Sequence, residues 1–139
     1  MHRLISTKQA QMSRNVTLKN ETTGTEDCCF DDSEFPGYEY EGFYFMELGG
    51  TYDCKIELFG GLKSYCTSAD RVLCHVLRED VVCGRVHMME VKVGEDVYYI
   101  RRSELEGYQG EKEFYYYYTR KDLIQVNDVV NHHLLWGIE

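Results

Sequence analysis

Lysine and arginine are absent between Lys19 and Lys55, although residues 20–54 contain ten of the chain's 24 acidic residues. The rest of the 139-residue chain holds fifteen basic and fourteen acidic residues, so this stretch accounts for the net charge of −9. Such a field repels phosphate, and nucleic-acid binding needs clustered lysine and arginine. We therefore expect no direct nucleic-acid binding. The same field would attract a basic protein surface.

The sequence also lacks a run of about eighteen apolar residues, the length that suggests a transmembrane helix. The first residues, MHRLISTKQAQM, contain cations but no apolar segment typical of a secretory signal. We therefore expect a cytoplasmic protein that binds no membrane and keeps its six cysteines as free thiols. The alternative is a secreted protein whose signal peptide has been removed, in which an even number of cysteines could form disulfides.

CxxC pairs, which structural zinc sites usually use, are missing as well. If Glu79-Asp80 forms a two-residue turn, then Cys74, Cys83 and His87 share one face of a hairpin. Arg85 would lie on the same face and repel a dication, so we expect no metal and no other cofactor. A Cys/His zinc module at these three residues is the weaker alternative.

Elements typical of an active site are equally scarce. The cysteines and histidines between residues 74 and 87 lack a nucleophile elbow, a helix N-terminus or a glycine-rich oxyanion loop. None of the expected constellations of nucleophile, base and oxyanion donors is recognisable. The sequence therefore favours a non-enzymatic protein.

The distribution of apolar residues favours one β-rich domain. Residues 1–25 are polar, with no sustained apolar period, and are predicted to form a flexible tail. Residues 26–139 contain aromatic and β-branched runs separated by turn signals about every eight to twelve residues. This pattern predicts an α+β, mainly β fold: a small antiparallel meander sheet or a partly closed barrel.

Individual segments predict particular hairpins and a C-terminal helix. Gly49-Gly50 would turn a strand over 38–48 into a second strand over 51–59, in which Ile56 and Leu58 face one way and Lys55 and Glu57 the other. Glu79-Asp80 and Gly94-Glu95-Asp96 would form two further turns. From Thr119 the period becomes helical, which predicts an amphipathic C-terminal helix with an apolar face of Leu123, Val126, Val130 and Leu134.

Acidic residues and aromatic rings alternate within the base-free stretch, above all between Phe35 and Phe45. Rings supply binding energy at interfaces, and an array of carboxylates can match a basic protein patch or imitate nucleic-acid phosphates. We therefore expect an inhibitor or adaptor that docks on a basic protein through residues 26–48; a solvated charged face is the alternative interpretation. The residues expected to contact the partner are Asp31, Asp32, Glu34, Tyr38, Glu39, Tyr40, Glu41 and Tyr44.

Tyrosine is abundant, with twelve residues, four of them consecutive at 115–118. Phenol groups inside a β-barrel offer polar contacts to a small guest molecule. A Tyr-lined pocket for a small ligand is therefore the second function class that the sequence suggests.

Overall fold

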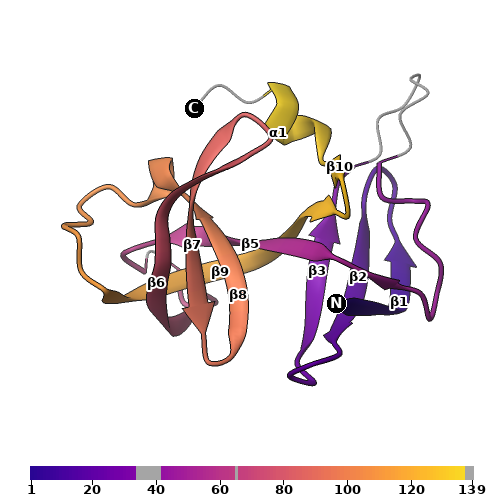
Figure 1. The fold of residues 1–139 in the computed structure, drawn as a ribbon, viewed down its shortest axis with the longest axis horizontal. Coiled ribbons are helices and arrows are strands. Elements are labelled where there is room, and N and C mark those ends of the chain that lie inside the picture. Colours follow the sequence, from indigo (N-terminus) through magenta and orange to yellow (C-terminus); the bar gives the residue numbers. More distant parts are fainter. Residues whose placement is uncertain (34–41, 65, 137–139) are drawn as a thin grey trace.

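The computed structural model describes residues 1–33, 42–64 and 66–136. These residues form ten strands, one 3₁₀ turn and one short α-helix (Figure 1). The elements are β1 (His2–Gln9), β2 (Arg14–Asn20), β3 (Glu26–Asp31), β4 (Thr51–Tyr52), β5 (Cys54–Gly61), β6 (Asp70–Cys83), β7 (Val86–Val93), β8 (Asp96–Arg101), η1 (Arg102–Glu104), β9 (Glu113–Val126), β10 (Val129–Val130) and α1 (His132–Trp136).

Five strands close into a barrel, which occupies the left half of Figure 1. Around the barrel the order is β5, β8, β7, β6 and β9, and β9 pairs again with β5. The predicted mainly β class is confirmed, and the barrel is closed, whereas the sequence predicted either a small meander sheet or a partly closed barrel. A simple meander does not describe the sheet, because β5 pairs with β8 in parallel and β9 returns to lie between β5 and β6.

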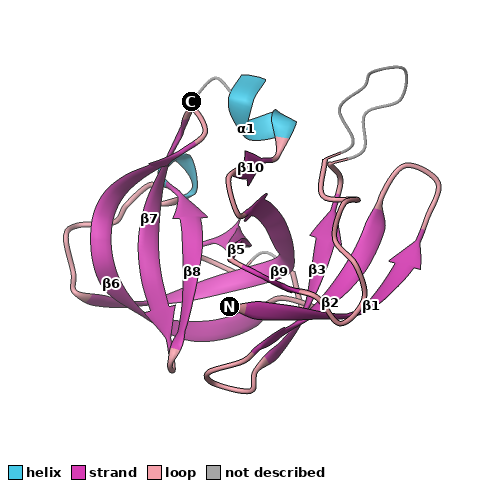
Figure 2. Cartoon of the chain, turned by 45° about the vertical axis from the view of Figure 1, so that its right-hand side comes forward, coloured by secondary structure: helices cyan, strands magenta, loops and turns pink. Residues whose placement is uncertain are grey.

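The N-terminal residues form a second group of strands beside the barrel, which Figure 2 shows from another side. Strands β4, β1, β2 and β3 are neighbours in that order, and β3 joins the barrel through a parallel pairing with β9. The structure therefore differs from the flexible tail predicted for residues 1–25, because most of these residues form two paired strands. Leu4, Val16 and Leu18 are at most 1% exposed, because alternate positions of β1 and β2 face a core shared with the barrel.

The β6–β7 hairpin turns later than predicted. Strand β6 continues through Glu79 and Asp80, with register irregularities between Val76 and Val81, and Cys83 pairs with Val86. The turn lies at Gly84, whose φ of 63° suits glycine. A Cβ atom at Gly84 would also come within 2.9 Å of the Leu134 carbonyl oxygen. The predicted hairpin at Gly94 is present, between β7 and β8.

The C-terminal helix exists but is much shorter than predicted. Residues 119–126 belong to β9, in which Leu123 packs into the main core while Ile124 packs into a second, smaller cluster. A strand buried on both sides produces consecutive apolar residues that resemble a helical period. Residues 42–48 form turns, so the predicted strand before Gly49 is not observed over these residues.

All six cysteines are free in the structure. Cys29, Cys54, Cys74 and Cys83 are buried, and burial raises the pKa of Cys54 and of Cys74 to about 12. No helix formed by the described residues has the length and apolar character needed to cross a membrane.

Candidate functional site

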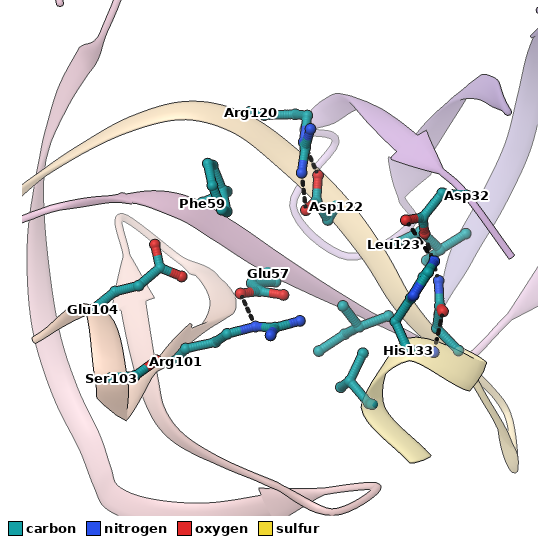
Figure 3. Close-up of a pocket in the computed structure, with 13 residues that line it drawn as sticks. Asp32, Glu57, Phe59, Arg101, Ser103, Glu104, Arg120, Asp122, Leu123 and His133 are labelled. Carbon is teal, nitrogen blue, oxygen red and sulfur yellow. Dashed lines mark hydrogen bonds and ion pairs between the residues drawn. The ribbon is translucent and has the colours of Figure 1, made fainter. Parts of the chain in front are cut away.

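A cavity of about 540 Å³ lies where the barrel meets the end of β3 and the C-terminal segment (Figure 3). Its floor is apolar, with Leu123, Ile124 and Leu134. Its walls carry seven ionisable side chains: Asp32, Glu57, Arg101, Glu104, Arg120, Asp122 and His133. Four carboxyl groups therefore face two guanidinium groups and one imidazole around this space.

Glu57 is the most deeply buried of these carboxyl groups. It belongs to β5, lies directly opposite Asp122 of β9, and is only 1% exposed. The Nε of Arg101, at the end of β8, donates a hydrogen bond of 2.8 Å to its Oε2. Burial nevertheless raises the pKa of Glu57 to about 7, and nearby Glu104 and Asp122 act in the same direction. A buried carboxyl with a shifted pKa inside a cleft is typical of a functional site.

Arg120 and Asp122 form the second charged pair. Arg120 donates from Nε and Nη2 to the two carboxylate oxygens of Asp122, at 2.6 and 3.0 Å. Its guanidinium carbon lies 4.6 Å from the ring centre of Phe30 and 4.8 Å from that of Phe59. Two hydrogen bonds and two rings therefore hold Arg120 in one orientation. Burial raises the pKa of Asp122 above its usual range.

Asp32 connects the end of β3 to the C-terminal segment. Its Oδ1 accepts a hydrogen bond of 2.8 Å from the Nδ2 of Asn131, and its Oδ2 lies 3.1 Å from the Nε2 of His133. These contacts fix α1 beside the cavity, as Figure 3 shows.

Glu104, on η1, is held by uncharged groups. Its Oε2 accepts hydrogen bonds from the Gly60 backbone N–H at 3.1 Å and from the Tyr116 hydroxyl at 3.4 Å. Its Oε1 is buried and has no hydrogen-bond partner among the described residues. Burial raises the pKa of Glu104. A buried acceptor without a donor is costly, so this oxygen requires an explanation.

The raised pKa of Glu57 leads to a testable prediction about stability. The unfolded chain releases the proton of Glu57 near the ordinary pKa of 4.5, whereas the folded protein retains it up to about 7. The contribution of this group to stability is therefore greatest at low pH, and falls as the pH rises between these values. Relative to a Glu57→Gln variant, the wild type should lose about 3 kcal/mol of unfolding free energy across this window.

Urea unfolding of both proteins between about pH 4 and pH 8 measures this difference, since shared ionisations cancel. Glu106→Gln, a change at an exposed carboxylate, provides the control and should show no comparable trend. A stability difference between the wild type and the Glu57→Gln variant that does not vary with pH would contradict the burial argument.

The residues predicted to contact a partner have different positions. Asp31 is fully buried and accepts a hydrogen bond of 2.7 Å from the Nε of Arg14, so the expectation that it faces a partner is wrong. Tyr44 is half-buried, with its ring centre 4.0 Å from the guanidinium carbon of Arg14. Asp32 lines the cavity. Glu34, Tyr38, Glu39, Tyr40 and Glu41 lie outside the described residues.

Basic residues from other strands reach the base-free stretch. Asp27 is buried and receives contacts from the Lys121 ammonium group and from the Tyr98 hydroxyl, the latter at 2.7 Å. Arg3 of β1 pairs with Glu21. Part of the acidic charge is therefore used inside the fold, and the stretch does not present an unbroken field of one sign.

The three possible metal ligands are separated. Cys74 and Cys83 are buried in different clusters, and the side chain of His87 is exposed with its Nδ1 2.9 Å from Asp80. The predicted shared face is wrong, because the turn lies at Gly84 and Cys83 pairs with Val86. The part of the chain that the structure describes contains no cluster of three or more metal-ligating side chains.

The tyrosine-lined pocket that the sequence suggests has a counterpart of about 190 Å³, with Tyr98 and Tyr118 in its wall. This volume is below the range of about 300–1,000 Å³ that is typical of small-molecule sites. The Tyr98 hydroxyl already donates a hydrogen bond to Asp27. Tyr116, from the same run of tyrosines, is fully buried in the core. The larger, charged cavity is therefore the stronger candidate site.

Most residues that line this cavity carry no clear signal in the sequence. Glu57 lies in an alternating strand on the face opposite to Ile56 and Leu58, and the sequence around Glu104 has no motif that indicates a site. Arg101 and Arg120 belong to different strands, β8 and β9, and line the same cavity because β5 lies between these two strands. Comparison with known proteins adds nothing to this geometry: no family model, no curated protein and no solved structure matches the chain.

Proposed function

We propose that this is a non-enzymatic acidic binding protein, an inhibitor or adaptor that docks on a basic surface of a partner protein. The single observation that carries the proposal is the excess of carboxyl groups over arginines in the cavity, four against two. Burial raises the pKa of Glu57 to about 7 and also raises that of Glu104, so a basic group from a partner would stabilise their charged forms. The chain as a whole adds a net charge of −9. A concave site with a low-dielectric floor concentrates such a field and steers a basic partner toward it.

The cavity also has exposed aromatic residues on or near its wall. Phe59 lines the cavity and is 42% exposed, and Trp136, which is 57% exposed, belongs to α1, the helix that contributes His133 and Leu134 to the wall. Aromatic residues of this kind often dominate binding energy at protein interfaces. A carboxylate array can also imitate nucleic-acid phosphates, so the proposed partners include proteins that bind nucleic acid. Free cysteines suit a reducing compartment such as the cytoplasm.

Affinity capture from the source cells, followed by purification of the captured protein, tests the proposal. The captured protein should have a basic surface, and its affinity should weaken with salt because screening shortens the field to about 8 Å at physiological ionic strength. Asp32→Lys, at the cavity, should slow association about tenfold or more. Asp128→Lys, at an exposed carboxylate away from the cavity, should change it little.

Binding that is insensitive to salt and to Asp32→Lys would contradict the proposal. Affinity that falls equally in the Asp32→Lys and Asp128→Lys variants would attribute the effect to overall net charge rather than to the cavity.

A further inference from the structure

The carboxyl groups around the cavity each contact a basic side chain, with one exception. Arg101 binds Glu57, Arg120 binds Asp122, and His133 contacts Asp32. No lysine, arginine or histidine of the described residues forms an ion pair with the remaining carboxylate, Glu104. Glu104 is therefore the one carboxyl group of the cavity without an ion-pair partner among these residues. A cation placed beside it would stabilise its charged form against the burial that raises its pKa.

Glu104 is oriented as a binding group. Gly60 and Tyr116 hold its Oε2 at 3.1 and 3.4 Å, and a guanidinium reaches the buried Oε1 once the carboxylate turns toward the cavity and releases the longer of these contacts. The other oxygen, Oε1, is buried without a donor among the described residues, and Figure 3 shows the carboxylate directed into the cavity from the barrel side. A buried acceptor of this kind gains strongly from a charged donor.

The ring of Phe59 stands on the same side of the cavity as Glu104 (Figure 3). It already accepts one planar cation, since the guanidinium carbon of Arg120 lies 4.8 Å from its centre. With 42% of the residue exposed, part of the ring remains open to a second cation. A carboxyl group and an aromatic ring that line the same cavity are suited to a flat, delocalised cation that forms hydrogen bonds at its edge and stacks on its face.

We propose that Glu104 and Phe59 form the receptor for the guanidinium group of an arginine side chain on the basic partner protein. This inference rests on the proposed docking function and names the group that the cavity receives. Arg101 faces the same space but is bound to Glu57 at 2.8 Å, and the carboxylates still outnumber the cations. The cavity volume of about 540 Å³ is ample for one arginine side chain.

Arginine fits this receptor better than lysine for two reasons. A guanidinium is planar and presents its donors as a fork, which matches the two oxygens of a carboxylate. It is also more weakly hydrated than an ammonium, so it loses less on entering a cavity with an apolar floor. Lysine would supply the missing charge without the stacking contact.

Two short peptides provide the probe: acetyl-Gly-Arg-Gly-amide and the same peptide with lysine. Each is titrated into ¹⁵N-labelled full-length protein, and the backbone N–H of Gly60, which donates to Glu104, reports on the site. We expect saturable shifts at Gly60 with the arginine peptide and about tenfold weaker binding of the lysine peptide. Glu104→Gln should weaken arginine binding about tenfold, whereas Glu106→Gln, at an exposed carboxylate nearby, should leave it unchanged.

Phe59→Leu keeps an apolar side chain but removes the ring, so it should reduce the preference for arginine over lysine. Equal binding of the two peptides, or arginine binding that Glu104→Gln does not change, would overturn the inference. If a purified basic partner still binds in a salt-dependent manner while the arginine peptide does not, the arginine receptor at Glu104 and Phe59 is refuted but the proposed docking function is supported. If basic partners do not bind either, both the arginine receptor and the docking function are refuted.

Discussion

Replacing Asp31 with alanine should lower the free energy of unfolding by about 3–5 kcal/mol, the range for breaking a buried ion pair. Asp31 is fully buried, and its partner Arg14 is only 6% exposed. Asp31 also accepts hydrogen bonds from the backbone N–H and the hydroxyl of Ser33, at 3.0 and 2.5 Å. Truncation would leave the Arg14 guanidinium buried without its counter-charge, and urea unfolding measures the loss.

Asp32 provides the matched control for this experiment, because it is the next residue and is also a carboxylate. It is half-buried and contacts Asn131 and His133 at the edge of the cavity. Asp32→Ala should therefore cost about 1 kcal/mol or less. Equal losses for Asp31→Ala and Asp32→Ala would contradict a structural role for the Arg14–Asp31 pair.

Deleting residues 1–20 should abolish cooperative folding. The deletion removes β1 and β2 together with Leu4, Val16 and Leu18, each of which belongs to the main core. Burial of three such side chains contributes about 5–9 kcal/mol, at about 1.5–3 kcal/mol each. Since a domain is stable by only about 5–15 kcal/mol, the truncated chain has little stability left. Circular dichroism during thermal unfolding measures the outcome.

Two point variants of the N-terminal strands make the same test without changing the chain length. Leu18→Ala should cost about 2–5 kcal/mol, because it leaves a cavity in the core. Ile5→Ala, at a position that is 42% exposed, should change the stability by about 0.5 kcal/mol or less. A truncated protein that unfolds cooperatively near the wild-type temperature would show that β1 and β2 are dispensable.

The sequence predicts the mainly β class well, because the turn signals and the alternation within strands are local. Gly94 and the residues around it show this: the predicted hairpin matches the pairing of β7 with β8. The β-strands of residues 1–20 were missed because their buried residues are separated by polar ones in a segment rich in serine, threonine and asparagine. The helix over residues 119–126 was predicted wrongly because β9 is covered on both sides, which removes the alternation.

The candidate site could not be predicted for a different reason. Its charged residues come from five separate parts of the chain, which meet only through the non-local pairing of β5 with β8 and β9. The sequence alone also does not distinguish an aspartate that stabilises the fold, such as Asp27 or Asp31, from one that lines a cavity, such as Asp32. Burial and ion pairing, which separate these roles, depend on tertiary structure.

The central claim is that the charged cavity is the docking face, and backbone hydrogen exchange with and without the captured, purified basic partner tests it most directly. Partner binding should slow exchange around the cavity, at Gly60, across residues 101–105 and across residues 131–134, because these backbone groups surround the site. The exposed tip of the β7–β8 hairpin, at Gly94 and Glu95, lies outside the cavity lining and should exchange as before. Unchanged exchange around the cavity, with protection at that tip or elsewhere, would contradict the claim.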